Sequence, residues 1–366
     1  MRKKTIRNAA FIITLLSVQL LAFNTTEVKA AGKKPRNIIL FIGDGMGTAQ
    51  VYSAMSASDT PLFLERFPYA GFSKTFSADN YITDSAAGGT AIACGTKTNN
   101  GMIGVTPGLT AVSSITEIAQ KNGLATGILS TSAVTHATPA SFVAHNPGRG
   151  NYEEIAKDFL SGTADIFIGG GEDHFRNRSD GADLTVSLRE QGYDVVYTLD
   201  DLKKSRSEKI AALLAKEHMP PAGEGRAGML REMTIQAIRL LSQDKDGFFL
   251  MIEGSMIDWA CHEKDIDYSI SETLDMDEAI GAALEFAEKD KKTLIVVTAD
   301  HETGGLTLTG GNMNNKTVRA EFIETGSHTG VMVPVFSYGP GAARFSGIND
   351  NTFFFNEFIS LLRLRK

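Results

Sequence analysis

Acidic side chains and histidines recur in this sequence just after short apolar runs. Asp44 follows the first run, Glu253 ends another, and the pair Asp300-His301 follows a third. Carboxylate oxygen and imidazole nitrogen are zinc ligands, and oxygen ligands also suit magnesium. The pattern therefore indicates a divalent metal centre, although a glycine-rich turn such as the one around Asp44 is common after any strand.

Two further segments carry residues suited to the same chemistry. Asp258 and His262 are four residues apart, so both side chains would face one side of a helix and could bind one ion. His328 lies in a Gly-Ser-His-Thr-Gly stretch before another apolar run. An exposed ion pair would also explain Asp258 and His262, but Glu253 just upstream favours the metal ion.

A candidate nucleophile and a candidate phosphate ligand complete the set. Ser85 opens a stretch of small residues, where the N-terminus of a helix would stabilise a phosphate on its hydroxyl. A simple helix cap is the alternative, and no Gly-x-Ser-x-Gly elbow surrounds Ser85, so a Ser-His-Asp hydrolase is not indicated. Arg149 offers forked donors suited to two phosphate oxygens, although a lone loop arginine is normally solvated.

The segments that must position these residues alternate between strand-like and helix-like patterns. Apolar runs typical of buried strands lie at 37–42, 125–129, 165–168, 248–252, 293–297 and 331–336. Helix-length stretches lie at 113–121, 152–160, 226–241, 270–287 and 352–362. The alternation predicts an α/β fold, with a mostly parallel central sheet sandwiched by helices. The more polar stretch 179–225 is expected to hold peripheral helices and loops. Ligands of such sheets collect at the carboxyl ends of the strands, where the clusters should converge.

Residues 1–30 have the three-part pattern of a secretory signal peptide. A basic start precedes an apolar run, and small or permissive residues precede the expected cleavage after Ala30. The run is shorter than the ~20 residues that span a bilayer, so no stable membrane anchor is expected, and an uncleaved anchor is the alternative. The protein is therefore expected to be secreted or periplasmic. Residues 31–366 are expected to form a single catalytic domain.

The charge balance limits the partners. The chain carries a formal net charge of −7, and removal of residues 1–30 takes away five basic residues and one acidic residue, which leaves −11. This balance disfavours nucleic-acid binding. An acidic protein that handles an anion needs local positive charge, which bound metal ions supply. Secretion would permit a disulfide between Cys94 and Cys261, but two free, buried thiols are expected.

Together these motifs resemble those of the alkaline phosphatases, and the resemblance runs from Asn37 to about Gly341. It rests on Asp84-Ser85-Ala86-Ala87, the Glu253, Asp258 and His262 spacing, Asp300-His301 and His328-Thr329-Gly330. It implies hydrolysis of phosphate monoesters at alkaline pH, with Ser85 as the nucleophile, a phosphoserine intermediate and Arg149 clamping the phosphate. Inorganic phosphate would bind at the same place.

The resemblance also implies three metal sites, two for zinc and a third that is usually for magnesium. The implied ligands are, in that order, Asp258, His262 and His328; Asp44, Ser85, Asp300 and His301; and Asp44, Thr138 and Glu253. Two such zinc ions can clamp the attacking and the leaving oxygen of an in-line displacement.

Three features depart from some bacterial relatives. His136 stands where some carry aspartate, so the third site could accept zinc or cobalt instead of magnesium. Trp259 stands where some carry lysine, which predicts weaker retention of phosphate. The short span from His301 to His328 predicts a reduced lid, and it leaves a homodimer open.

Two alternatives stay open. The first is another hydrolase of the same superfamily, a phosphodiesterase or a sulfatase. Ser85 lacks the local motif of a sulfatase nucleophile, and diesterases tend to lack the third-ion ligands that Thr138 and Glu253 supply. The second alternative is a non-catalytic secreted protein that binds metal or phosphate.

Overall fold

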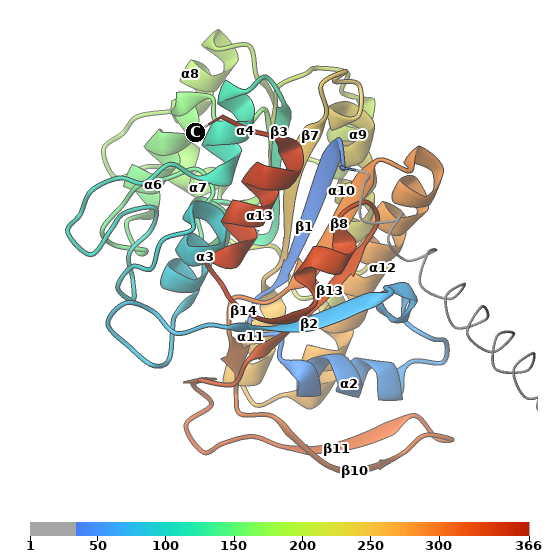
Figure 1. Ribbon diagram of the computed structural model, residues 1–366. Coiled ribbons are helices and arrows are strands. Elements are labelled where there is room, and N and C mark those ends of the chain that lie inside the picture. The colour runs from blue at the N-terminus through green and yellow to red at the C-terminus, as the bar shows by residue number, and fades with distance from the viewer. Residues whose placement is uncertain (1–33, 366) are drawn as a thin grey trace, which may run out of the picture.

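A computed structural model describes residues 34–365, so the predicted signal peptide lies outside the described residues. A ten-stranded sheet runs through the molecule in the order β14-β2-β13-β8-β1-β7-β3-β4-β6-β5 (Figure 1). Its strands, in chain order, are β1 (Asn37–Gly43), β2 (Tyr69–Lys74), β3 (Ala125–Ala133), β4 (Ile166–Gly170), β5 (Asp194–Val196), β6 (Ile210–Ala215), β7 (Phe248–Gly254), β8 (Thr293–Thr298), β13 (Val333–Tyr338) and β14 (Gly347–Asp350).

The helices pack against both faces of this sheet. They are α2 (Thr48–Ala57), α3 (Ser85–Cys94), α4 (Ile115–Lys121), α5 (Ala137–Ala140), α6 (Tyr152–Asp158), α7 (Glu172–Arg176), α8 (Leu184–Glu190), α9 (Leu199–Lys204), α10 (Met229–Leu241), α11 (Met256–His262), α12 (Ile266–Asp290) and α13 (Phe353–Leu362). Short 3₁₀ turns are η2 (Phe63–Arg66), η3 (Phe159–Ser161), η4 (Ala222–Glu224) and η5 (Ala342–Phe345). Among the described residues, no helix combines the length and the apolar character needed to cross a membrane.

The predicted mostly parallel sheet is confirmed. Within the described sheet, β13 alone runs against its neighbours, pairing antiparallel with both β2 and β8. The expected strand at 331–336 therefore exists, but it begins at Val333 and is reversed. Strand β1 lies between β7 and β8, with Ile42 opposite Glu253 on one side and Thr298 on the other.

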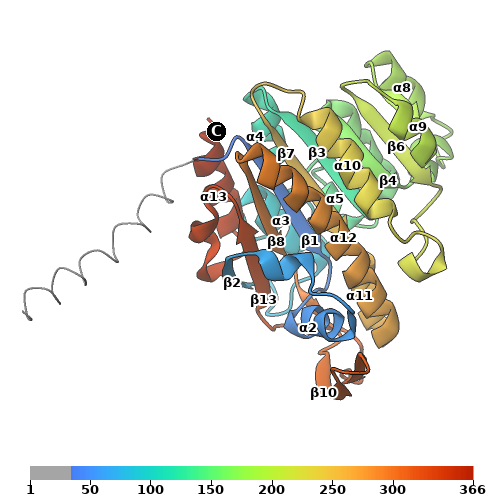
Figure 2. The same cartoon turned by 90° about the vertical axis from the view of Figure 1, so that its right-hand side faces the viewer.

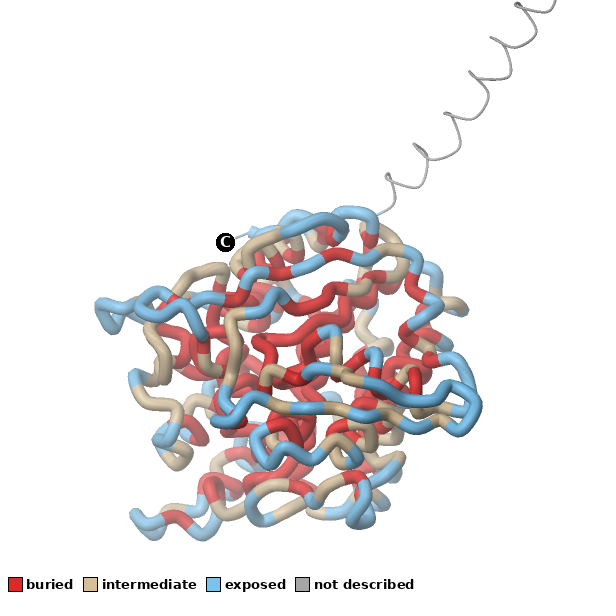
Figure 3. Tube along the Cα trace, turned by 90° about the horizontal axis from the view of Figure 1, so that it is seen from below, coloured by how far each residue is buried: buried red, intermediate tan, exposed pale blue. Residues whose placement is uncertain are grey.

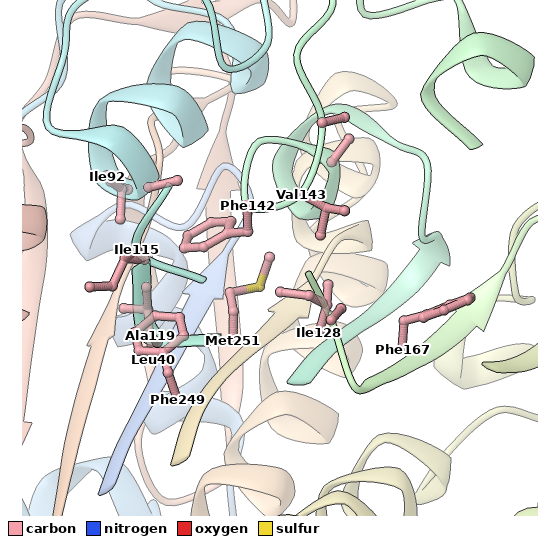
Figure 4. Packing of buried hydrophobic residues seen from close by; sticks show 14 of the residues in the cluster. Leu40, Ile92, Ile115, Ala119, Ile128, Phe142, Val143, Phe167, Phe249 and Met251 are labelled. Carbon is pink, nitrogen blue, oxygen red and sulfur yellow. The ribbon is translucent and has the colours of Figure 1, made fainter. Parts of the chain in front are cut away.

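Alternate residues of β1 belong to two separate cores. Leu40 packs in the cluster beneath α3, α4 and α13, whereas Phe41 packs beneath α10 and α12 (Figures 1 and 2). Figure 4 shows the first cluster, in which Phe142 stacks on Phe249 with 6.3 Å between ring centroids. Fully burying each such side chain contributes about 1.5–3 kcal/mol to stability. Because both faces of β1 are covered in this way, every position from 38 to 42 along the strand is apolar.

The expectation for residues 179–225 was incomplete. Helices α8 and α9 are present, but β5 and β6 also lie there and extend the central sheet. The apolar run of β6, Ile210–Ala215, is short and its flanks are polar, so composition averaged over the whole stretch concealed it.

The carboxyl ends of the central strands lie at the end of the molecule where α2 and α11 lie (Figures 1 and 2). The short span between His301 and His328 holds a two-stranded hairpin, β10 (Thr307–Asn312) and β11 (Thr317–Glu321), at the same end. Most residues of this hairpin are exposed, in contrast to the buried interior (Figure 3).

Candidate metal centre

Three neighbouring strands deliver the central acidic residues. Asp44 directly follows β1, Glu253 is the penultimate residue of β7, and Asp300 comes two residues after β8. Because these strands are parallel and adjacent, their carboxyl ends meet at one edge of the sheet. All three carboxylates are fully buried there. The convergence predicted from the sequence is confirmed for them.

His301 joins two of these carboxylates to the candidate nucleophile. Its Nε2 atom lies 3.3 Å from Asp44 Oδ1 and 3.4 Å from Asp300 Oδ2. The Ser85 hydroxyl lies 3.1 Å from the same nitrogen. The four residues expected at one zinc site therefore surround one point, and His301 and Asp300 are completely buried beside it.

A second group of donors forms on α11. Asp258 Oδ1 lies 3.3 Å from His262 Nε2 and 3.5 Å from His328 Nε2, and the two imidazole nitrogens are 3.2 Å apart. The four-residue spacing places the first two on one face of the helix. The two-residue strand β12 (His328–Thr329) pairs with β9 (Glu302–Thr303), which holds His328 against them. The His262 side chain is 42% exposed, so this group opens to solvent.

A third group lies behind Asp44. Asp44, His136 and Glu253 offer ligand atoms that all lie within 4.8 Å of one another. Thr138 Oγ1 is 3.5 Å from Asp44 Oδ2. One oxygen of Glu253 is held by Ser130 at 2.5 Å and by Ser255 at 2.6 Å, which leaves its other oxygen free for the group.

Several buried polar atoms at this centre make no hydrogen bond within residues 34–365. They are Asp44 Oδ1, Asp300 Oδ2, Glu253 Oε1 and His136 Nδ1. Buried polar atoms are rarely left unpaired, because each costs free energy unless a partner satisfies it. Four such atoms in one place, all of ligand type, fit divalent cations, which would satisfy them together.

The electrostatics of the centre point the same way. Burial, reinforced by Asp258 and Glu253, raises the pKa of Asp300 to about 8. Burial likewise raises the pKa of Asp44 and of Glu253. Burial lowers the pKa of His136 to about 3, which keeps its ring neutral with a lone pair available. A bound cation would reverse the cost of ionising the carboxylates, so the donor set suits metal ions.

Ser85 is not the cap of its helix. Asp84 occupies the N-cap position of α3 and accepts a 3.0 Å hydrogen bond from the Ala87 amide. The Ser85 hydroxyl is thereby left to face His301, which removes the simple capping interpretation. Arg149 approaches through Asp84, donating from Nη1 to Asp84 Oδ2 at 2.9 Å, and its Nη2 lies 3.5 Å from His136 Nε2.

Two residues have evident roles that the sequence analysis did not assign to them. Asp84 ties Arg149 to α3, and Thr303 contacts both Asp258, through its hydroxyl, and His301 Nδ1, at 3.2 Å. Asp84 adjoins Ser85 and Thr303 lies two residues after His301, so proximity to a motif was the available signal.

Trp259 and the cysteines are also placed. Trp259 is partly exposed and meets the His136 ring edge-on, with 6.0 Å between centroids.

Cys94 and Cys261 are both buried and unbridged, as expected. Burial raises the pKa of the Cys261 thiol to about 11, so it stays protonated at neutral pH.

Comparison with known proteins identifies the family. The sequence model for alkaline phosphatase matches residues 35–321. The chain is 34% identical to alkaline phosphatase 4 of Bacillus subtilis (strain 168), over 92% of each protein. It is 32% identical to the alkaline phosphatase of Escherichia coli (strain K12), covering 91% of this chain and 87% of that one.

Solved structures agree in fold. The alkaline phosphatase from the Antarctic bacterium TAB5 superposes with a TM-score of 0.87 at 42% identity, covering 91% of this chain and all of that one. The Thermus thermophilus alkaline phosphatase gives a TM-score of 0.85 at 26% identity, covering 92% and 93%. The chain therefore belongs to the alkaline phosphatase family, whose members are hydrolases that act on phosphate monoesters.

Proposed function

We propose that this protein hydrolyses phosphate monoesters at alkaline pH through a phosphoserine intermediate on Ser85. The observation that carries the proposal is the position of the Ser85 hydroxyl, 3.1 Å from His301 Nε2. That nitrogen is itself within 3.4 Å of Asp44 and Asp300, so the hydroxyl adjoins a set of metal-ligand atoms at the start of a helix. A serine hydroxyl needs such surroundings, because alone it is a weak nucleophile.

Two zinc ions and a third ion, usually magnesium, are proposed as cofactors. The first zinc would be held by Asp258, His262 and His328; the second by Asp44, Ser85, Asp300 and His301; and the third ion by Asp44, Thr138 and Glu253. When bound, the ions supply positive charge that lowers the pKa of the serine and stabilises the leaving oxygen.

The third site has a precedent and a local difference. A histidine-to-aspartate variant of the TAB5 enzyme, 40% identical to this chain, has been solved with Mg bound in its M3 site. His136 adds a nitrogen to the third group here. Nitrogen ligands suit zinc and cobalt better than magnesium, so this site could accept either of those ions.

The residues of the chain have distinct roles in the reaction. Ser85 Oγ bonds to phosphorus while the bond from phosphorus to the alcohol oxygen breaks, and the alcohol leaves with the serine proton. Arg149, oriented by Asp84, holds two oxygens of the transferred group. Water then hydrolyses the phosphoserine, which releases inorganic phosphate and restores the hydroxyl. The His262 side chain is 42% exposed, so the departing alcohol could reach solvent on this side of the centre.

The decisive test is Ser85→Ala. Loss of the nucleophile is expected to lower kcat for a phosphate monoester by at least about a thousandfold. Ser56→Ala is the matched control, because Ser56 is also a buried helical serine but bonds only to its own helix at Tyr52. Wild-type turnover by Ser85→Ala would reject Ser85 as the nucleophile.

A second experiment compares turnover of phosphate monoesters, phosphate diesters and sulfate esters. Preference for the monoesters separates the proposed activity from that of a diesterase or a sulfatase.

We also propose that residues 1–30 are removed after Ala30 on export, which leaves residues 31–366 as one catalytic domain in a secreted or periplasmic protein. The charge pattern and apolar run of the segment support this. Mass spectrometry of the exported protein should give an N-terminus at Ala31. Sedimentation of that protein decides between a monomer and the homodimer that the reduced lid leaves open.

A further inference from the structure

A two-residue segment just after β6 holds the turn that leads to His136. The Ala133 amide donates a 3.1 Å hydrogen bond to His218 Nδ1. In the preceding residue, Glu217, the side-chain Oε2 lies 3.2 Å from His174 Nε2. On the other side of that ring, His174 Nδ1 is 2.6 Å from the Thr135 hydroxyl. Adjacent residues of one segment therefore hold the end of β3 directly, at Ala133, and the turn that follows it through a histidine, at Thr135.

This segment is fitted closely to the sheet. A Cβ atom on Gly170, the last residue of β4, would lie only 2.1 Å from the Glu217 carbonyl oxygen. No side chain can be accommodated there unless the segment moves. The backbone that carries His218 is thus packed directly against the end of β4.

The His218 ring also contacts both positions at which this chain departs from some bacterial relatives. It meets Trp259 edge-on with 4.7 Å between centroids, and His136 edge-on with 5.8 Å. Trp259 and His136 are in turn edge-on to each other. The rings of His136, His218 and Trp259 therefore each contact the other two, so a shift of one ring changes the space available to the others.

His218 itself is not a ligand of the third group. Its Nδ1 lone pair accepts from the Ala133 amide, so its Nε2 carries the proton when the ring is neutral. His136, by contrast, keeps a buried Nδ1 with no hydrogen bond among residues 34–365, in the group with Asp44 and Glu253. Where that nitrogen lies depends on the turn that His218 holds.

We propose that His218 is a positioning residue for the third metal site, acting through the hydrogen bond from the Ala133 amide. The bond fixes the turn that presents His136 to Asp44 and Glu253. The inference rests on the proposed function, in which this group binds the third ion. Residues that orient ligands without touching the ion commonly change metal affinity when they are replaced.

The test starts from enzyme that holds two equivalents of zinc, which is titrated with Mg²⁺ and, separately, with further Zn²⁺, and binding is followed by calorimetry and by tryptophan fluorescence. Trp259 is the only tryptophan in the sequence, so its emission reports directly on the three rings. His218→Phe keeps a ring but removes the acceptor, and it is expected to weaken Mg²⁺ binding about 10- to 100-fold. His218→Asn keeps an acceptor near the Nδ1 position and should therefore bind Mg²⁺ more tightly than His218→Phe does, with most of the wild-type affinity restored.

The control removes a comparable bond elsewhere. Tyr193→Phe deletes a 2.6 Å hydrogen bond from a buried side chain to the Ala164 carbonyl, and it should leave Mg²⁺ affinity unchanged. If His218→Phe does not fold, His218→Ala against His218→Asn gives the same comparison. Wild-type affinity in the variant without an acceptor, or equal losses with and without one, would overturn the proposal. A wild-type enzyme that binds no third ion would instead reject the third site of the proposed function.

Discussion

Arg149 and Asp84 are joined by a 2.9 Å hydrogen bond from Nη1 to Oδ2. The other oxygen of this carboxylate accepts from the Ala87 amide and so caps α3, and Oδ2 also accepts from the Gly101 amide. One side chain thus determines where α3 begins, at Ser85, and which way the guanidinium points. Asp84 therefore fixes the proposed nucleophile, Ser85, and the proposed phosphate ligand, Arg149, relative to each other.

Replacing Asp84 with alanine should therefore have two effects. Arg149 loses its orienting partner, so inhibition by inorganic phosphate should weaken severalfold. Loss of the helix cap should lower the free energy of unfolding by about 1 kcal/mol. Inhibition kinetics and denaturant unfolding measure the two effects. Asp84→Asn is the comparison, because it keeps a capping oxygen without the charge. Unchanged phosphate inhibition in Asp84→Ala would show that Arg149 does not depend on this contact.

Replacing Trp259 with lysine should tighten inhibition by inorganic phosphate. Trp259 follows Asp258 on α11 and touches the His136 ring, so a lysine there would add a cation beside the site that Arg149 serves. A partly exposed charge contributes up to about 1 kcal/mol, or roughly fivefold in the inhibition constant. Trp259→Met separates loss of the ring from gain of the charge. No tightening in the lysine variant relative to the methionine variant would contradict the prediction.

Removal of metal should destabilise the protein as well as inactivate it. Asp44, Asp300 and Glu253 are fully buried, and each has an oxygen without a hydrogen bond in the described part of the chain. When the free metal concentration is 100 times the Kd of a site, binding there stabilises the folded state by about 2.7 kcal/mol. Calorimetry should show a lower Tm in chelator, restored by Zn²⁺ and Mg²⁺.

A matched variant tests whether these carboxylates are the cause. Glu253→Gln keeps the contacts with Ser130 and Ser255 possible but removes one buried charge. The drop in Tm on chelation should be smaller in this variant than in the wild type. An identical Tm with and without chelator in the wild type would count against metal binding at this centre.

Asp277 should impose a pH dependence on stability that is separate from the metal centre. Burial raises its pKa to about 6, although the Phe63 and Leu64 amides donate to its carboxylate and act in the opposite sense. Between pH 4 and 6 the folded state therefore holds a proton that the unfolded state releases. The contribution of Asp277 to stability is present at about pH 4 and lost by about pH 6, by roughly 2–3 kcal/mol.

The measurement is denaturant unfolding of wild type and Asp277→Asn at several pH values from 4 to 7. The wild type should lose stability relative to the asparagine variant as the pH rises through this window. Asp200→Asn, at an exposed position on α9, should follow the wild type. Parallel curves for Asp277→Asn and the wild type would show that this carboxyl group has no raised pKa.

Residue types and short spacings were sufficient to predict the fold class and to single out several of the candidate donors, whereas the grouping of these donors into three metal sites came from the resemblance to a family and stays a prediction. Donors that follow apolar strands, such as Asp44 and Asp300, must meet if the strands are parallel neighbours, and the spacing of Asp258 and His262 acts within one turn of helix. The helix spacing depends only on local geometry, which a sequence displays directly, whereas the meeting of Asp44 and Asp300 also required β1 and β8 to be neighbours in the sheet.

The tertiary structure alone decided which other residues support those donors. Asp84 meets Arg149 across 65 positions, and His218 meets Ala133 across 85. Nothing in the spacing of these residues marks them as partners, just as nothing local shows that β13 is reversed or that β6 extends the sheet. Such contacts arise only when helices and loops pack on the assembled sheet, because hydrogen bonds and ring contacts depend on separation in space and not along the chain.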